Sequence, residues 1–210
     1  MEKAIAKKYE LLKDDTIEVG GDTLYRIRAL KDFRDICAGD LGGYIKEEHN
    51  LSHDGNAWVG GNAYVFGNAR VYENAQVDDS ARVYGSAHVS GNAYVFDCAL
   101  VQDNARISGN VYVRDKAFIG GRAHVDGDAR IRSNAQINSS ADYTVVQGFG
   151  TVQRTTTFYK TQDRGIAVTC GCFSGTLDAF RTQVKVTRSG KIAKEYLALA
   201  DLMEMHFKEA

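Results

Sequence analysis

The chain has 210 residues, of which 44% are apolar and 25% charged, the composition of an ordinary globular protein that can bury a sizeable core. Its 26 Lys and Arg residues balance 27 Asp and Glu residues, so the basic excess that draws nucleic acid is missing and we expect no nucleic-acid partner. The absence of proline excludes a proline-rich linker, and four cysteines are too few and too unevenly spaced for a disulfide framework.

The amino-terminal segment MEKAIAKKYELLKDD is charged from its second residue and lacks the apolar stretch of a secretory signal. No segment of the chain approaches the ~18 apolar residues of a membrane span. We therefore expect a cytoplasmic protein with no membrane partner.

Residues 1–54 predict an amino-terminal β cap. Thr16 to Val19 and Leu24 to Leu30 alternate apolar and polar residues around Gly20-Gly21-Asp22, which is typical of a hairpin. Leu41 to Ile45 then leads into the next region.

A six-residue repeat fills residues 55–144 in fifteen units without an insertion. The third position is Ala in fourteen units, with Val111 as the exception, and the fifth is Val or Ile in every unit but the last, which has Tyr143. Two apolar positions spaced by two residues indicate one inward strand face. The first two positions are mostly Gly, Asp, Glu or Ser followed by Asn, residues that tolerate the left-handed backbone of a tight corner. Each unit therefore predicts a short strand and a corner.

This repeat resembles that of the hexapeptide-repeat proteins, in which three units form one triangular coil of a left-handed β-helix. The resemblance implies a mainly β fold: a left-handed parallel β-helix of about five coils, roughly 24 Å long at ~4.8 Å per coil. It also implies a trimer. Ala and Val fill the interior, so we expect any ligand on the outside or at the ends.

The outward fourth residue of each unit falls into three columns, because positions eighteen apart lie on one face. The second column is the most apolar and predicts a subunit interface, whereas the third is polar and mainly cationic. The first column is Trp58, Gln76, Tyr94, Tyr112 and Arg130; the second is Tyr64, Arg82, Leu100, Phe118 and Gln136, flanked by Phe66 and Tyr84; the third is Arg70, His88, Arg106, His124 and Asp142.

Residues 145–210 lose the repeat and predict an α+β module of two strands followed by two helices. The strands are expected at Val145 to Tyr159 and Gly165 to Cys172. Ser174 or Thr176 would cap a helix running to about residue 187, and a second helix would run from residue 192 to about 208.

Both flanking regions carry segments that resemble a group of uncharacterised solenoids borne on phages and prophages. These segments are YRIRAL, AGDLGGYI and NLS before the repeats, and RTTTFYK, CGCFSGTLDAF and KEYLALADLMEMHF after them. The resemblance implies a viral origin, and hence the cytoplasm of the host cell, but it supplies no activity.

The most suggestive polar cluster lies in the carboxy-terminal module. A helix start offers free backbone N–H groups and a positive dipole end, and a neighbouring strand would add cations, hydroxyls and a stacking ring. The alternative interpretation is a threonine-rich exposed strand beside an ordinary helix cap. The predicted ligand-binding residues are Arg154, Thr155, Thr156, Thr157, Tyr159, Lys160, Ser174, Gly175 and Thr176.

The third column allows two further hypotheses. Arg70, His88, Arg106 and His124 could hold an anion as a secondary site, or they could form a merely solvated face. His88 and His124 are also the fallback general bases of an acyltransferase, an activity known among hexapeptide-repeat proteins. Against it, the repeat lacks the protruding loop that such transferases use, and the two histidines would lie ~9.6 Å apart.

We expect no metal site and no cofactor. Cys170 and Cys172 have no second pair of ligands for a structural zinc, and we predict that these two cysteines, Cys37 and Cys98 are buried small apolar residues.

The sequence thus favours a non-enzymatic, trimeric, phage-type binding protein. The working hypothesis is sequestration of a phosphate-bearing small molecule, such as a host nucleotide signal of anti-phage defence. The alternatives are a hexapeptide-repeat acyltransferase that uses acyl-CoA and a structural solenoid that binds proteins through its second column.

Overall fold

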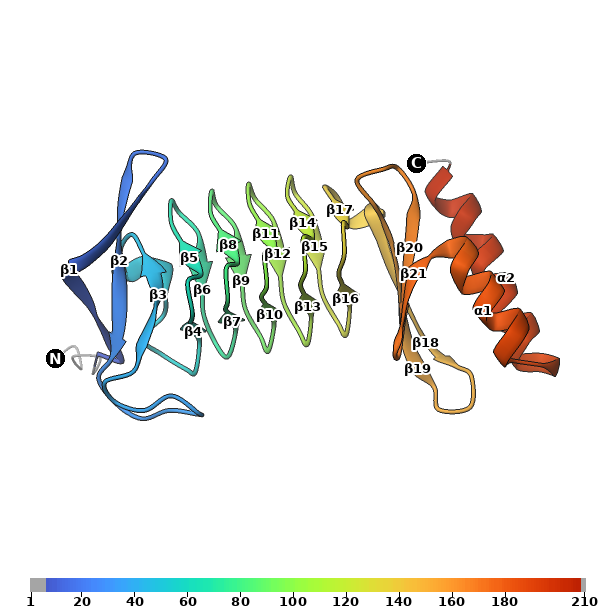
Figure 1. Ribbon diagram of the computed structural model, residues 1–210, viewed down its shortest axis with the longest axis horizontal. Coiled ribbons are helices and arrows are strands. Elements are labelled where there is room, and N and C mark those ends of the chain that lie inside the picture. Colours follow the sequence, from blue (N-terminus) through green and yellow to red (C-terminus); the bar gives the residue numbers. More distant parts are fainter. Residues whose placement is uncertain (1–6, 209–210) are drawn as a thin grey trace, which may run out of the picture.

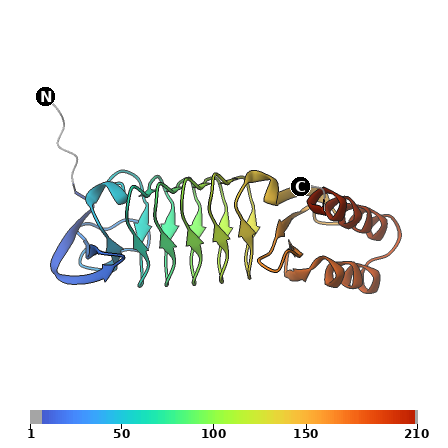
Figure 2. The ribbon, with the colours of Figure 1, turned by 90° about the horizontal axis from the view of Figure 1, so that it is seen from above.

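The structure, a computed structural model, describes residues 7–208 as an elongated β-solenoid with a β cap at one end and a mixed module at the other (Figures 1 and 2). Residues 1–6, which belong to the charged segment that argued against a secretory signal, lie outside the described residues. Among the described residues, neither helix is long and apolar enough to cross a membrane.

The repeats form fourteen two-residue strands, which pair in parallel with the strands eighteen residues away. Stacked strands make three flat faces, as the repeat predicts. Face 1 is β4 (Trp58–Val59), β7 (Gln76–Val77), β10 (Tyr94–Val95), β13 (Tyr112–Val113) and β16 (Arg130–Ile131); face 2 is β5 (Tyr64–Val65), β8 (Arg82–Val83), β11 (Leu100–Val101), β14 (Phe118–Ile119) and β17 (Gln136–Ile137); face 3 is β6 (Arg70–Val71), β9 (His88–Val89), β12 (Arg106–Ile107) and β15 (His124–Val125).

The repeat positions behave as their chemistry requires. Third and fifth residues such as Ala99 and Val101 are fully buried, so the interior is filled by side chains. The first residue of each of the first fourteen units has a φ between 54° and 77°, the left-handed conformation that Gly and Asp tolerate.

The fifteenth unit does not form a coil strand, contrary to the prediction. Ser139 has a φ of −145° and begins the 3₁₀ turn η2 (Ser140–Asp142), and Tyr143 already belongs to the next strand. Without a left-handed first residue the chain cannot turn the corner, so it leaves the stack here.

The amino-terminal cap contains the predicted hairpin. Strands β1 (Tyr9–Val19) and β2 (Asp22–Ala29) pair antiparallel across two glycines with positive φ. Strand β3 (Leu41–Ile45) pairs antiparallel with β2 and parallel with β5, and after η1 (Glu48–Asn50) residue 51 bridges to residue 71. The stacking therefore begins before residue 55.

The carboxy-terminal module has four strands instead of the predicted two. They form an antiparallel sheet in chain order: β18 (Tyr143–Phe149), β19 (Arg154–Lys160), β20 (Ile166–Cys170) and β21 (Phe173–Thr176). The expected single strand from residue 145 to residue 159 is a hairpin, because residues 150–153 form a turn.

Helices α1 (Leu177–Thr187) and α2 (Gly190–Lys208) follow as predicted. Thr176 caps α1, since the backbone N–H of Ala179 donates to its Oγ1 at 3.2 Å. The helices cover one side of the sheet, and the last coil covers the other (Figure 2). The molecule therefore has two cores, one inside the solenoid and one beneath the helices.

Candidate functional site

The predicted ligand strand β19 is largely a structural element. Thr157 and Tyr159 are fully buried toward the last coil: Thr157 Oγ1 accepts a hydrogen bond from the backbone N–H of Arg130 at 3.0 Å, and the Tyr159 hydroxyl lies 3.2 Å from Thr169 Oγ1. Thr156 is also fully buried, and its hydroxyl donates to the Cys170 sulfur at 3.2 Å. These three residues bind the sheet to its neighbours, so they are not available to a ligand.

The two predicted cations, Arg154 and Lys160, lie at opposite ends of β19, about 20 Å apart at ~3.3 Å per residue. The Lys160 ammonium is already paired with the Asp142 carboxylate at 3.0 Å. The single anion cradle expected from the sequence is therefore not formed.

Ser174, Gly175 and Thr176 lie in β21, on the far side of β20 from β19. Gly175 and Thr176 line a cleft of about 970 Å³, together with Lys160 and residues of α1 and α2. Ser174 was one of two predicted helix caps, but it is a strand residue.

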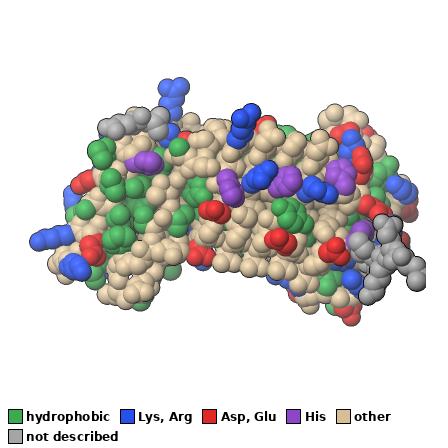
Figure 3. All heavy atoms as spheres, turned by 180° about the vertical axis from the view of Figure 1, so that it is seen from behind, with side chains coloured by type: hydrophobic (Ala, Val, Ile, Leu, Met, Phe, Trp, Pro, Cys, Tyr) green, Lys and Arg blue, Asp and Glu red, His purple; other side chains and the backbone are tan. Residues whose placement is uncertain are grey.

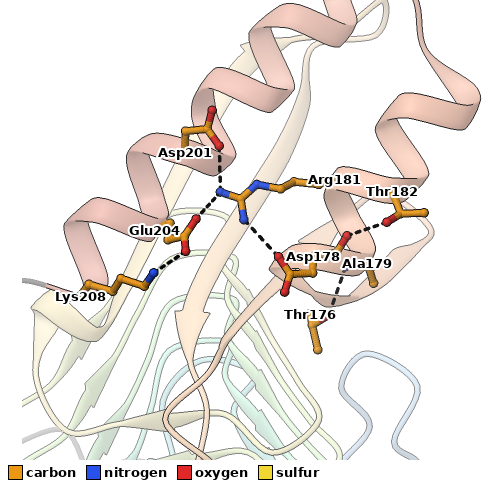
Figure 4. Close-up of polar contacts among 8 residues, drawn as sticks. All are labelled: Thr176, Asp178, Ala179, Arg181, Thr182, Asp201, Glu204 and Lys208. Atoms are coloured by element: carbon orange, nitrogen blue, oxygen red, sulfur yellow. Dashed lines mark hydrogen bonds and ion pairs between the residues drawn. The ribbon is translucent and has the colours of Figure 1, made fainter.

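Five charged side chains of α1 and α2 beside this cleft are paired with one another (Figure 4). The Arg181 guanidinium contacts the carboxylates of Asp178 at 3.2 Å, Asp201 at 2.8 Å and Glu204 at 2.5 Å. Lys208 reaches Glu204 at 2.5 Å, and hydrogen bonds from Lys208 and Arg181 lower the pKa of that carboxyl. Three carboxylates against two cations leave the start of α1 unfavourable for a phosphate.

A different hollow lies where face 1 meets the carboxy-terminal module. Two adjoining cavities, of about 410 and 620 Å³, share Tyr112, Arg130 and Gly171 and together form what we call the arginine hollow. Its lining includes Asn92, Phe96, Asn110, Tyr112, Arg114, Asp128, Arg130, Arg132, Arg154, Thr155, Gly171 and Cys172.

The floor of the hollow is aromatic. Tyr112 is 39% exposed. Among the described residues, no other large apolar side chain of the coil is as exposed. The Arg130 guanidinium lies over its ring, 5.1 Å from the centroid, and the Arg114 guanidinium lies 5.9 Å from the Phe96 centroid. A planar group could stack here beside positive charge.

Four guanidiniums face only two nearby carboxylates. Asp115 lies between Arg114 and Arg132, at 4.0 and 3.9 Å, on successive coils. Neither Arg130 nor Arg154 has an ion-pair partner within residues 7–208. The second carboxylate, Asp128, accepts hydrogen bonds from the side chains of Asn110 at 2.9 Å and Gln147 at 2.8 Å, which lower its pKa.

Gly171 sets the position of Arg154. Its φ is +59°, and a Cβ atom on this residue would lie 2.2 Å from Arg154 Nη1. The positive φ favours glycine in the β20–β21 turn, and a side chain at this position would also shift the guanidinium of Arg154.

Four residues of the third column, Arg70, His88, Arg106 and His124, lie on face 3 as predicted, whereas the fifth, Asp142, lies in η2. Burial, and then the charges of Arg106 and Arg70, lower the pKa of His88. His124 Nε2 lies 3.4 Å from Ser108 Oγ, and neither histidine has a carboxylate within ion-pair distance in the described part of the chain. The two histidines lie two coils apart, so they cannot share a proton.

The second column is less exposed than the sequence suggests. The rings of Phe66 and Tyr84 stack at 5.0 Å, and the Arg82 guanidinium lies 5.4 Å from the centroid of Tyr64. These contacts leave the apolar residues of the column only partly exposed. In the first column Trp58 is buried beneath Phe33 of the cap.

The cysteine prediction is wrong for most of the residues: Cys37, Cys98 and Cys172 are exposed and Cys170 is half-buried. They lie in loops and corners or at strand ends, where no core is available. Within residues 7–208, no three His, Cys, Asp or Glu side chains are grouped so as to hold a metal ion.

Sequence reasoning identified Arg154, Thr155, Tyr112 and Arg130 but did not bring them together. It missed Arg114 and Arg132, which are sixth residues of their units. Sorting the sixth position as well as the fourth into columns would have found them, since they lie eighteen residues apart beside Arg130.

A comparison with protein-family models found no match, and a search of curated proteins found none either.

Proposed function

We propose that this chain is a non-enzymatic binding protein that holds a phosphate-bearing small molecule in the arginine hollow. The observation that carries the proposal is the set of four guanidiniums around an exposed tyrosine ring; two of the four have no carboxylate at ion-pair distance within residues 7–208. Guanidiniums bind phosphate oxygens in a bidentate way, and the cleft beneath α1 offers no comparable surplus of charge.

Within this class we favour a nucleotide, such as a host nucleotide signal that a phage protein would sequester. The Tyr112 ring and the Arg130 guanidinium supply a surface on which a base stacks, and the amides of Asn92 and Asn110 lie on one side of it. Phosphates would lie toward Arg154, Arg130 and Arg132.

For the assembly we propose a left-handed coil and a trimer in the cytoplasm, as the hexapeptide resemblance implies. Face 2 is the proposed contact, since it carries the half-buried column of Tyr64, Phe66 and Tyr84. Light scattering at micromolar concentration would show a trimer, and a strict monomer would contradict the proposal.

The binding test is calorimetry of the full chain with pyrophosphate, ADP and a cyclic nucleotide. We expect the Arg130→Ala and Arg154→Ala variants to bind roughly tenfold more weakly or worse, and Arg82→Ala, an outward arginine of face 2, to bind like the wild type. Acetyl-CoA turnover is measured in parallel. Turnover that disappears in His88→Ala, with no nucleotide bound, would replace this proposal by an acyltransferase.

If neither binding nor turnover is observed, the phosphate-binding proposal is wrong. The remaining alternative is then a structural or protein-binding solenoid, which a pull-down through face 2 would address.

A further inference from the structure

Face 3 carries a straight row of four basic side chains, one per coil. In the parallel register Arg70 lies directly opposite His88, His88 opposite Arg106, and Arg106 opposite His124. We call these four residues the cationic row. Figure 3 shows alternating histidines and basic side chains following one another along this side of the solenoid.

The arginines of the cationic row differ from the other outward arginines of the coil. Arg82 lies over the ring of Tyr64 at 5.4 Å and Arg130 over that of Tyr112 at 5.1 Å. In the described part of the chain, Arg70 and Arg106 have neither an aromatic ring nor a carboxylate as a partner. Both side chains are exposed.

This arrangement is electrostatically unfavourable when nothing is bound. The two permanent charges of the row, on Arg70 and Arg106, lie two coils apart, about 9.6 Å, and a protonated imidazole in the row would lie opposite an arginine at about 4.8 Å, where like charges destabilise a sheet. The pKa of His88 is lowered by burial and by the charges of Arg106 and Arg70, so the repulsion already acts on this imidazole.

Little within the protein offsets that charge. The ring centroids of Tyr72 and His88 lie 6.1 Å apart in an edge-to-face arrangement, and Ser108 Oγ lies 3.4 Å from His124 Nε2. Asp126, two residues after His124, accepts a hydrogen bond from the Tyr143 hydroxyl at 3.2 Å. At the other end Glu47 pairs with His49 at 3.4 Å. An external anion is therefore the group that would relieve the repulsion.

We propose that the cationic row is a second anion-binding site, separate from the arginine hollow, and that it takes a linear inorganic polyphosphate chain. The row is straight and spans three coil steps, about 14 Å, so it suits an extended ligand with closely spaced charges. Sites for single-stranded nucleic acid combine cations with several stacking rings, and among the described residues Tyr72 is the one aromatic ring in contact with the row. A chain of phosphates without bases fits the row better.

The test uses the full chain in an Arg130→Gln background, which disables the hollow and leaves the row intact. Polyphosphate binding is measured at about pH 7.5 in two variants of this background. The row variant adds Arg70→Gln with Arg106→Gln. The matched control adds Arg82→Gln with Lys116→Gln, which removes the same charge outside the row. We expect the row variant to bind roughly tenfold more weakly and its salt slope to fall by about two. The matched control should be unchanged, and thermal melts check that each variant is folded.

Acidification gives a second readout. Because burial and the charges of Arg106 and Arg70 lower the pKa of His88, this imidazole gains its charge only below the usual pH range of a histidine; there polyphosphate binding should tighten in the same background, and His88→Gln should remove that gain. Undiminished binding in the row variant, or an equal loss in the matched control, would overturn the proposal. Equally tight, row-dependent binding of an oligodeoxythymidine or of polyglutamate would overturn the choice of ligand.

Discussion

The two ends of the coil stack differ in the backbone groups that they leave without a hydrogen-bond partner from a neighbouring coil. Apart from the bonds that join two strand residues, the hydrogen bonds between coils run one way: an N–H of one coil donates to a carbonyl of the next coil, for example Tyr64 N–H to Ala81 O at 3.0 Å. At these positions the first coil therefore exposes carbonyl oxygens and the last coil exposes N–H groups. Each end has to be covered by groups of the opposite kind.

The caps meet this requirement with different residues. At the amino-terminal end, side-chain donors cover carbonyls: Lys8 Nζ donates to Ala57 O at 2.7 Å, and Asn50 Nδ2 donates to Ala69 O at 2.8 Å. At the carboxy-terminal end, side-chain acceptors cover N–H groups, as Thr157 does for Arg130. The direction of the chain thus dictates the chemistry of each cap, and the two caps are not interchangeable.

The largest effect is expected at Asn50. It is fully buried, and Asn50→Ala leaves the carbonyls of Gly67 and Ala69 without this donor, so the free energy of unfolding should fall by about 3 kcal/mol. Asn74→Ala, in the exposed asparagine ladder of the coil, is the control and should change it by less than about 1 kcal/mol. Urea unfolding measures both, and equal losses would show that the cap has no special role.

The middle of the stack, remote from both ends, should respond to packing alone. Ala105 is fully buried, so Ala105→Leu overpacks a coil and should cost about 1–3 kcal/mol, whereas the outward Arg106→Ala should cost almost nothing. Thermal melts that rank the two variants the other way would contradict the inward and outward assignment.

The amino-terminal cap should also make stability depend on pH. Burial, and then the charge of Lys31, lower the pKa of Lys8 from 10.5 to about 8. Between about pH 8 and 10 the unfolded chain therefore binds more protons than the folded one, and the free energy of unfolding should rise by up to about 1.4 kcal/mol per pH unit. Lys8→Met should abolish the rise, and a wild-type profile that falls over this window would refute the assignment.

The smallest effect is expected at the carboxy-terminal end. Thr157→Val keeps the shape but leaves the Arg130 N–H without its acceptor, which should cost about 1 kcal/mol. Thr157→Ser keeps the hydroxyl and should recover part of that loss. Equal stability of the Val and Ser variants in urea unfolding would mean that this hydrogen bond contributes nothing.

The sequence predicted the coil because every unit repeats one physical rule: Ala and Val inside, a left-handed first residue at the corner. It could not predict where the frame stops, since the fifteenth unit, SSADYT, matches the pattern in letters while Ser139 takes an extended conformation. There the hydrogen bonds to Asp142 from the backbone of residues 138 and 139 favour the 3₁₀ turn instead.

The candidate site was predictable only in parts. The two cations of RTTTFYK belong to one short segment of the sequence, but a strand places its two ends about 20 Å apart. The hollow that contains Arg154 is completed by Arg130, Arg132 and Gly171, which come together only through coil stacking and the β20–β21 turn. No local sequence pattern indicates which residues of an irregular module will contact which residues of a repeat.

The most direct test of the account is a calorimetric titration of ADP into Arg154→Ala and Lys160→Ala, the two ends of β19, beside the wild type. If the ligand lies in the arginine hollow, Arg154→Ala should weaken binding roughly tenfold or more, and Lys160→Ala, whose ammonium is paired with Asp142, should leave it unchanged. A loss of binding in Lys160→Ala with none in Arg154→Ala would contradict the account and return the site to the cleft beneath α1.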